Sequence, residues 1–486
     1  MMNSNNQIQI VTQKEHDVQG ISDLEPFIIG LFKLDKPELA EQCLDAFAGS
    51  AATFGQYDNL SKCYFKIKQY EKSLKYGEMA LANAPSPQHA YSARFNLINV
   101  YNHANHPEKA LLYLDINDSI FNTADLDLER AYTYFLLNRK KEAQKILERT
   151  LEVKTDLPEE TVTKIKFNLG TYYLYEDKFQ KGMRHFILDG AKMKLWNTET
   201  IFARNQKLNL PFWQGSPGCT SLIVYAEAGI GDELINVRFM KLLKDRGINA
   251  VWYESIVDDN KKTNDRPGIV ELFRKNGIPV ITKIEEGLRL PNAMWTYSMH
   301  LPIYMNLEYK DLWYGPYLQA CPQFKEKWKI DGCKKKIGIR WKGSKFYDQD
   351  LHRSYPVKQL YNNIKKYDVD YFSLQRDEGI EEIVDFPGII DLSSGFKTIE
   401  DTFAFISNLD YVITSCTSIA HMAASMGKRV FIFVPISAYY TWSHSGQQSP
   451  WYGDHVTLLR QQKPRTWDEP MAELVNILDQ EGFDVK

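Results

Sequence analysis

The sequence has little excess charge of either sign and no long hydrophobic run. Its formal net charge is −3 over 486 residues. Charge alone therefore gives no reason to expect broad binding to nucleic acid or to a membrane surface, although a local basic groove would fit this composition. No segment approaches the roughly 18 apolar residues that span a bilayer. The polar first residues lack the apolar core of a signal peptide, so we expect a cytoplasmic protein.

Cysteine is scarce and its spacing is irregular. The six cysteines form no CxxC pair, which favours reduced thiols over a disulfide framework. His, Cys and Asp residues do not cluster at metal-ligand spacing, and the DxD motifs at 125–127 and 368–370 are interpreted as solvated turns. A complete GxGxxG dinucleotide fingerprint is also missing. The sequence thus predicts no metal site and no cofactor.

A repeat occupies the first part of the chain. Small residues followed by apolar ones recur at intervals of 33, 37, 33 and 39 residues, at Ala40, Ser73, Ala110, Ala143 and Gly182. Tetratricopeptide repeats have a period of about 34 residues, and stacked units bury a continuous core. We predict tetratricopeptide-like helical repeats over residues 20–205, with a generic helical bundle as the alternative. Such arrays commonly offer a concave face, so we expect a protein partner or self-association through the repeats.

Short apolar runs alternate with helical stretches after a Pro- and Gly-containing connector at 210–219. The predicted strands are 222–225, 250–253, 279–281, 293–297, 337–341, 371–374, 411–413, 430–434 and 456–459. Strands that alternate with helices predict parallel sheets with both faces covered. The Lys-rich segment 323–336 divides the region. We therefore predict two Rossmann-like halves, 219–325 and 336–486, with a ligand cleft between them.

The first predicted half opens with a strand, a glycine-containing turn and a helix that is expected over 233–246. Gly229 and Gly231 permit close backbone approach and positive φ. Asp232 follows them at the start of the helix. An acid there can cap free N–H groups, and it can also face the cleft and take a proton from an acceptor hydroxyl. The pattern alone favours the cap.

The second predicted half opens with a strand that ends at Trp341. Lys342, Gly343 and Lys345 follow it, and Arg353 precedes the next predicted helix. Cations beside the carboxyl end of a parallel strand suit a diphosphate. The alternative is solvated surface charge, the usual fate of Lys and Arg.

A strand, turn, helix and second strand are predicted over 411–435. The helix is expected from about Thr417 to Gly427, and its first turn contains the hydroxyls of Thr417 and Ser418. Free N–H groups and hydroxyls at a helix N-terminus form an anion site. His421, one turn further on, is open to two interpretations, a satisfied buried histidine or a residue near a ligand. The segment predicts a phosphate-bearing ligand.

These motifs resemble bacterial and phage tetratricopeptide-repeat proteins fused to a glycosyltransferase domain related to the heptosyltransferases. The resemblance covers about 220–486 and rests on four short motifs in order: G-x-G-D at 229–232, W-x-G with R-S-Y-P at 341–343 and 353–356, S-L-Q at 373–375, and the A-H-containing helix with G-K at 416–428. The later S-P-W-Y at 449–452 also fits. The resemblance implies an α + α/β fold, in which a helical solenoid precedes a GT-B-like pair of Rossmann-like domains. The first domain would bind the acceptor and the second the nucleotide sugar.

The same resemblance implies an inverting, metal-independent transfer from a nucleotide sugar, which is a substrate and not a cofactor. Asp232 would be the general base. The implied donor-binding residues are Gly229, Gly231, Lys342, Gly343, Lys345, Arg353, Gln375, Cys416, Thr417, Ser418 and His421. Cys416 stands where many relatives have Asp, and a thiol cannot reproduce the hydrogen bonds of a carboxylate to sugar hydroxyls. A different donor sugar or reduced activity would follow.

Three functions fit these residues. The first is a glycosyltransferase whose repeats recruit or cover the acceptor, which could be a protein, a glycan or a nucleic acid. The second is a non-catalytic repeat scaffold with a degenerate GT-B module. The third is sugar transfer to nucleic acid or a modified base. The matches at Asp232, Lys342, Arg353 and His421 favour the first function, and Cys416 favours the second.

Overall fold

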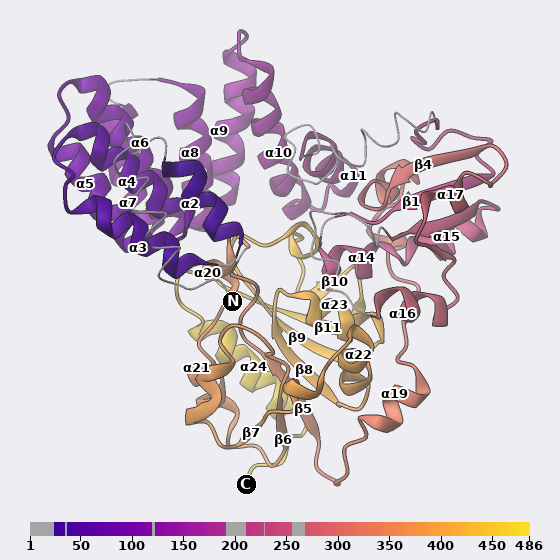
Figure 1. Ribbon diagram of the computed structural model, residues 1–486. Coiled ribbons are helices and arrows are strands. Elements are labelled where there is room, and N and C mark those ends of the chain that lie inside the picture. Colours follow the sequence, from indigo (N-terminus) through magenta and orange to yellow (C-terminus); the bar gives the residue numbers. More distant parts are fainter. Residues whose placement is uncertain are drawn as a thin grey trace, which may run out of the picture. The chain divides into compact units, whose positions relative to one another are not determined.

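The computed structural model in Figure 1 divides into two compact units, residues 1–154 and 155–486. It describes residues 24–34, 36–118, 122–190, 210–227, 229–254, 268–345 and 347–486. Parts of the predicted repeat region, 20–23 and 191–205, lie outside these ranges. Among the described helices, none is both long and apolar enough to cross a membrane.

The first unit consists of consecutive helices that pack in pairs. They are α2 (Leu24–Lys33), α3 (Pro37–Ala48), α4 (Phe54–Lys66), α5 (Tyr70–Ala82), α6 (Pro87–His103), α7 (Pro107–Asp118), α8 (Ala124–Leu136) and α9 (Lys140–Val153). The small residues Ser73, Ala110 and Ala143 are fully buried where the second helix of a pair meets the first. The Ser61 and Ser73 hydroxyls each donate to the other residue's carbonyl, at 2.8 and 2.7 Å. The predicted tetratricopeptide-like packing is confirmed.

From α4 onwards, the turn inside each helix pair repeats as well. Lys68, Asn105, Asn138 and Asp177 all have φ between 58° and 62°, a left-handed conformation that few non-glycine residues adopt. Their intervals of 37, 33 and 39 residues match those of the small residues. The fourth such turn joins α10 (Glu159–Tyr175) to α11 (Phe179–Met183), which continues into the π-helix η2 (Arg184–Asp189). One repeat therefore lies in the second unit.

Two glycines lie where the helices of this last repeat meet. A Cβ on Gly170 would lie 2.5 Å from the backbone nitrogen of Phe186 and 2.9 Å from the carbonyl oxygen of Gly182. Gly182 is also confined, because its Cβ would lie 2.9 Å from the carbonyl oxygen of Gly170 and 2.6 Å from Leu174 Cγ. Backbone atoms cannot move aside as a flexible side chain can, so these positions require glycine.

We expect Gly170→Ala to lower the free energy of unfolding by about 1–3 kcal/mol, because the added methyl group overpacks the contact. The matched control is Gly55→Ala in α4, where the new Cβ would meet nothing within 4 Å. Alanine is the better helix former, so this variant should gain about 0.5–1 kcal/mol. Urea titrations followed by circular dichroism measure both. Equal stability of Gly170→Ala and the wild type would contradict the close packing.

The second unit contains two sheets. The first is parallel with strand order β3-β2-β1-β4, and the second has the order β10-β11-β9-β8-β5-β6-β7, parallel except for β10. The strands are β1 (Ser221–Tyr225), β2 (Asn249–Tyr253), β3 (Val280–Ile281), β4 (Ala293–Tyr297), β5 (Lys336–Arg340), β6 (Asp370–Ser373), β7 (Ile389–Ile390), β8 (Tyr411–Ser415), β9 (Arg429–Val434), β10 (Gln448–Ser449) and β11 (Gly453–Arg460). All nine predicted strands are present. β7 and β10 were not predicted, because two residues form no recognisable pattern.

Helices cover the sheets, as Figure 1 shows for the second one. α21 (Val357–Ile364) and α24 (Asp468–Gln480) pack on one of its faces, and α22 (Ile399–Ser407) and α23 (Ser418–Ser425) pack on the other. The first sheet is covered on one face by α14 (Ile230–Asn236), α15 (Phe239–Asp245) and α16 (Ile269–Lys275).

The prediction of a single helix over 233–246 is wrong, since α14 ends before α15 begins. The described short helices that connect these elements are α17 (Ile284–Gly287), η4 (Ser298–His300), α18 (Leu301–Tyr304), η5 (Tyr309–Asp311), α19 (Pro322–Lys327), α20 (Asp350–Arg353), η6 (Ile380–Asp385), η7 (Ser393–Gly395) and η8 (Tyr440–Trp442).

Candidate functional site

Residues of the second half that were predicted to bind the donor meet at the carboxyl ends of two neighbouring parallel strands. β5 pairs with β8, so the loop after β5 and the turn after β8 lie at the same edge of the sheet. A hydrogen bond joins them, in which Arg353 Nη1 donates to the Cys416 carbonyl at 2.9 Å. Ligands of open α/β sheets bind at such edges. The structure thus brings together two motifs that are about 60 residues apart in the sequence.

The Arg353 side chain is mostly buried, and its contacts fix the orientation of its guanidinium group. Its Nε donates to Asp350 Oδ1 at 2.8 Å, and its guanidinium stacks 4.3 Å from the centre of the Tyr347 ring. A Cβ on Gly343 would collide with this guanidinium. The glycine of the W-x-G motif therefore leaves room for Arg353, which is a local reason for that residue type.

Arg340, which the sequence analysis missed, adds a second buried cation at the end of β5. Its Nη2 pairs with Asp377 Oδ1 at 3.0 Å, and its Nη1 donates to the Leu374 carbonyl at 3.1 Å. Its Nε has no hydrogen-bond partner among the described residues. Burial lowers the pKa of Arg340 from its ordinary value. A cation inside an otherwise apolar strand was the signal available in the sequence.

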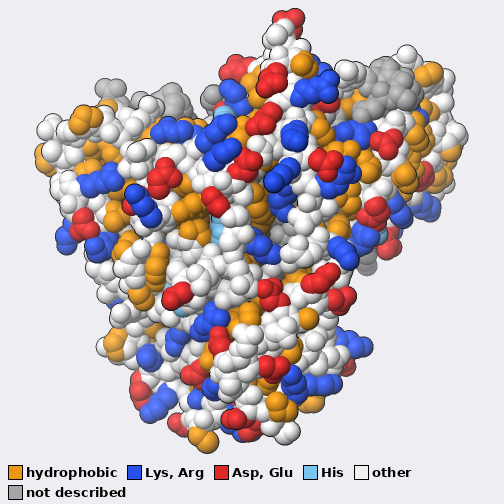
Figure 2. Space-filling view, turned by 180° about the vertical axis from the view of Figure 1, so that it is seen from behind, with side chains coloured by type: hydrophobic (Ala, Val, Ile, Leu, Met, Phe, Trp, Pro, Cys, Tyr) orange, Lys and Arg blue, Asp and Glu red, His pale blue; other side chains and the backbone are white. Residues whose placement is uncertain are grey.

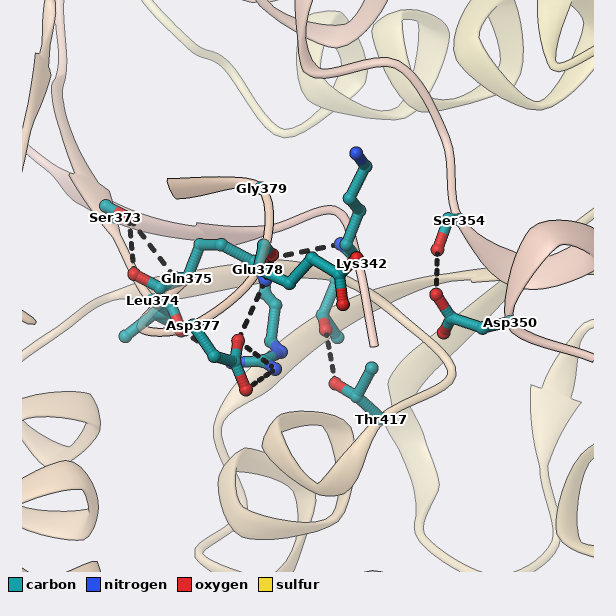
Figure 3. A network of polar contacts seen from close by, with 12 residues as sticks. Lys342, Asp350, Ser354, Ser373, Leu374, Gln375, Asp377, Glu378, Gly379 and Thr417 are labelled. Atoms are coloured by element: carbon teal, nitrogen blue, oxygen red, sulfur yellow. Dashed lines mark hydrogen bonds and ion pairs between the residues drawn. The ribbon is translucent and has the colours of Figure 1, made fainter. Parts of the chain in front are cut away.

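Gln375 and Lys342 are held by the loop around them, as Figure 3 shows. The Gln375 side chain accepts a hydrogen bond from the Lys342 amide at 3.1 Å and donates to the Glu378 carbonyl at 2.7 Å. It also donates to Asp377 at 3.1 Å. The Lys342 ammonium forms an ion pair with Glu382. Gln375 thus shapes the loop, and its predicted contact with a donor stays a prediction.

The turn before α23 is formed by buried hydroxyl and thiol groups. Thr417 is the N-cap residue, with its hydroxyl 3.4 Å from that of Thr414. Cys416 Sγ donates to the Phe433 carbonyl at 3.4 Å. Burial raises the pKa of Cys416 to about 12, although nearby Arg353 acts in the opposite direction. Cys416 is therefore a neutral thiol at physiological pH.

Asp232 lies at the start of α14. Its Oδ2 accepts a hydrogen bond from the Gly229 amide at 3.1 Å, so the capping interpretation is confirmed. The predicted positive φ is wrong at both glycines, since Gly229 has φ of −90° and Gly231 is helical. The predicted close approach is correct for Gly231, where a Cβ would lie 3.1 Å from His421 Cδ2 and 3.8 Å from Ser418 Cα. The helix that begins with the acid therefore contacts the helix that follows the predicted phosphate-binding turn.

His421 is buried and has a partner. Its Nδ1 lies 2.8 Å from the Tyr452 hydroxyl, and its ring stacks on Trp442 at 4.9 Å with an interplanar angle of 11°. Burial, followed by the charge of Arg238, lowers the pKa of His421 to about 3. These contacts fit the interpretation as a satisfied buried histidine. Its predicted place near a nucleotide stays a prediction.

Two tyrosines outside the predicted motifs are affected by the charge of Asp232. Burial, followed by the negative charge of Asp232, raises the pKa of Tyr439 well above its ordinary value. Burial raises the pKa of Tyr347 to about 12, and the negative charge of Asp232 acts in the same direction. Tyr347 also stacks on Arg353. The loops of both tyrosines have no regular pattern, so the sequence did not reveal either residue.

The remaining predicted ligands are less well defined. Lys345 acts electrostatically on Glu378, near Lys342. The part of the chain that the structure describes has no group of three or more His, Cys, Asp or Glu that could hold a metal ion. The 368–370 motif precedes and enters β6, whereas 125–127 lies in the first turn of α8 and was wrongly expected to be a turn.

Comparisons with known proteins give weak similarities. No family model matches the chain, and no curated protein matches it. A family 9 glycosyl transferase from Veillonella parvula DSM 2008 aligns with 55% of this chain and 90% of its own, at 13% identity and a TM-score of 0.36. The ADP-heptose LPS heptosyltransferase II of E. coli aligns with 54% of this chain and 99% of its own, also at 13% identity and a TM-score of 0.36.

A third similar structure corresponds to the helical repeats. It is a Podosopora anserina kinesin light chain with nearly identical TPR-like repeats, which aligns with 36% of this chain and 96% of its own, at 14% identity and a TM-score of 0.28. These solved structures are of the two kinds that the sequence resembles. Identity this low leaves the function to be argued from the residues of this chain.

Proposed function

We propose that the protein is a glycosyltransferase that moves a sugar from a nucleotide-sugar donor to an acceptor hydroxyl with inversion. The acceptor oxygen bonds to the anomeric carbon while the bond from that carbon to the diphosphate breaks. The proton of the acceptor passes to Asp232. The nucleoside diphosphate leaves from the side of α23. The repeats recruit or cover the acceptor.

The contact between α14 and α23 is the main support for this proposal. Gly231 packs directly against His421 and Ser418, so Asp232 lies next to the helix start that suits a phosphate. A general base and an anion site must be this close for a base to act on an acceptor while a diphosphate departs. Tyr347, which stacks on Arg353 and whose pKa the charge of Asp232 helps to raise, belongs to the same arrangement.

The cations of the second half are assigned to the leaving group. Arg340 is buried at the end of β5, Arg353 at the end of α20 is mostly buried, and Lys342 and Lys345 follow β5 in the chain. Fixed positive charge at the place where negative charge develops lowers the barrier. We propose that these side chains, without a metal ion, balance the diphosphate.

A non-catalytic scaffold is the second candidate, and two observations favour it. Cys416 is a neutral thiol where many relatives of the suggested family have Asp. Lys342 is already ion-paired with Glu382. Sugar transfer to nucleic acid has less support, because acidic and basic side chains are interspersed over the described surface visible in Figure 2.

We expect nucleoside diphosphates and nucleotide sugars to raise the thermal unfolding midpoint of the full chain, since a ligand that binds only the folded state stabilises it. Arg353→Gln should weaken the binding of the best of these probes at least tenfold, because charge-assisted bonds to phosphate are strong. Thermal shift against ligand concentration measures both effects, each variant being compared with its own unliganded midpoint. The wild-type shift should be the same in EDTA.

Lys358→Gln is the matched control, since Lys358 is an exposed cation on α21. It should bind the probe as the wild type does. If no nucleoside diphosphate or nucleotide sugar stabilises the wild type, the scaffold is the better description of the protein.

A further inference from the structure

The carboxyl end of β4 buries two hydroxyl groups that lack hydrogen-bond partners. Thr296 is the fourth residue of the strand, and Ser298 is the first residue of η4, directly after it. Both side chains are fully buried, and neither hydroxyl has a partner among the described residues. A buried polar group without a partner destabilises a fold. Two of them within three residues therefore require an explanation.

A third group of this kind lies on α14. Asn236 is 1% exposed, and neither the nitrogen nor the oxygen of its side-chain amide has a partner among the described residues. Asn236 follows Asp232 by four residues, a spacing that puts two side chains on the same face of a helix. α14 packs against η4, which begins at Ser298. The amide and the Ser298 hydroxyl thus belong to two elements that are in direct contact.

Strand pairing and alternation place Thr296 on the side of the sheet that α14 covers. Thr296 pairs with Val224 of β1, and Val224 lies in the apolar core that includes α14. The residues on either side of Thr296, which are Trp295 and Tyr297, lie in the core of the opposite face. Successive strand residues point to opposite faces of a sheet, so Thr296 points toward the α14 side. All three groups therefore lie where α14 meets the carboxyl end of β4.

The charges around these groups are negative. The described segments β1, α14, β4 and η4 contain no lysine or arginine. Asp232 and Glu233 lie in the first turn of α14, and Glu227 accepts a hydrogen bond from the Met299 amide of η4 at 3.0 Å. Like charges brought together at a binding site are unfavourable. A ligand that carries phosphate or carboxylate groups is therefore disfavoured here.

We propose that Thr296, Ser298 and Asn236 bind the acceptor, and that this acceptor is an uncharged sugar unit. The inference rests on the proposed transfer reaction and names its second substrate. Hydroxyl and amide groups both donate and accept hydrogen bonds, as the several hydroxyls of one sugar ring do. The serine or threonine side chain of a protein acceptor offers a single hydroxyl and would leave most of these groups without a partner. Asp232, on the same helix as Asn236, takes the proton of the sugar hydroxyl that attacks the donor.

The first test compares acceptors of different charge, with the full chain and the nucleotide sugar that gives the largest thermal shift. The probes are methyl glycosides of neutral pentoses, hexoses and heptoses, sugar phosphates, uronic acids and a peptide that contains serine and threonine. At least one neutral glycoside should raise the release of nucleoside diphosphate about tenfold or more over the rate with water, because a bound hydroxyl is held in position to react. The anionic sugars and the peptide should not raise it.

The second test removes the hydroxyls one at a time. Thr296→Val and Ser298→Ala should each raise KM for the stimulating glycoside about three- to tenfold, the effect of losing one hydrogen bond. Neither change should lower the thermal unfolding midpoint, because each removes a buried group that has no partner within the protein. A purely structural role predicts the opposite result, a lower midpoint with an unchanged KM.

Ser221→Ala is the matched control for both variants. Ser221 is 2% exposed and lies at the amino end of β1, the end of the same sheet that is away from Asp232. Its loss should leave KM for the glycoside as in the wild type. The donor-induced thermal shift should be unchanged in all three variants, since the proposed cations for the diphosphate lie on the second half.

The possible failures can be told apart. If the donor is bound and hydrolysed but no neutral glycoside stimulates the wild type, the inference is wrong and the proposed function stands. The same conclusion follows if only an anionic sugar or the peptide stimulates it, or if both variants keep the wild-type KM. If no nucleotide sugar binds or is hydrolysed, the proposed function fails and the inference falls with it. Thr296→Val keeps the shape of the side chain, so the second test stands even if Ser298→Ala does not fold.

Discussion

Asp232→Asn is expected to abolish sugar transfer almost completely, with kcat at least about a hundredfold lower, because a positioned general base contributes 10²–10⁴-fold. The amide has the shape of the carboxylate and its oxygen can still accept the hydrogen bond from Gly229, but it cannot take a proton. Donor binding should stay close to the wild type, since the proposed cations lie on the second half. Release of nucleoside diphosphate and the thermal shift measure the two quantities separately.

Asp245→Asn is the matched control for this prediction. Asp245 is an exposed carboxylate at the end of α15, in the same half, and it pairs with Lys241 at 2.7 Å. Such surface pairs contribute little to stability, so this variant should keep the wild-type rate. Full transfer activity in Asp232→Asn would show that another group takes the proton, and Asp232 would then be only a helix cap.

Arg238→Met is expected to lower the free energy of unfolding of the second unit by about 3–4 kcal/mol. Arg238 is only 1% exposed. Its guanidinium donates to the Ile235, Leu312 and Trp451 carbonyls and to the Tyr317 hydroxyl. Methionine fills much of the space but leaves buried carbonyls without a donor, at about 1–3 kcal/mol each. Urea unfolding monitored by tryptophan fluorescence is the appropriate measurement.

Arg246→Met serves as the control for Arg238. Arg246 is exposed and donates to a single carbonyl, that of Met305, at 3.0 Å. Its loss should change stability by less than about 1 kcal/mol, as for most surface substitutions. If both variants unfold at the same urea concentration, the hydrogen bonds of Arg238 to the loops at Leu312 and Trp451 do not contribute to the stability of the second unit.

The residue pattern predicted most of the fold. Buried parallel strands are continuous apolar runs, and all nine such runs became strands. The spacing of small residues predicted the repeats, because each repeat needs the same close contact between its two helices. Gly170, Gly182 and Ser73 show this directly. One prediction was wrong, because a single helix was expected where the structure has α14 and α15. The sequence on both sides of the break favours a helix, so the residue pattern does not reveal the break.

The arrangement of the candidate site was predictable in part. Motif spacing identified Asp232, Arg353 and the start of α23, and the structure brings these elements together. It did not identify Tyr347, Tyr439 or Arg340. The first two lie in irregular loops, and Asp232, whose charge acts on both, is 115 and 207 residues away from them in the chain. A periodic pattern contains no information about such contacts.

By itself, the sequence determined the elements of this protein, because local patterns of apolar, small and capping residues decide where helices and strands form. Only the tertiary structure decided what surrounds Asp232. It placed the start of α23 against Gly231 and η4 against α14. The physical reason is that these contacts depend on how sheets and helix pairs pack, and packing joins side chains that no local rule relates.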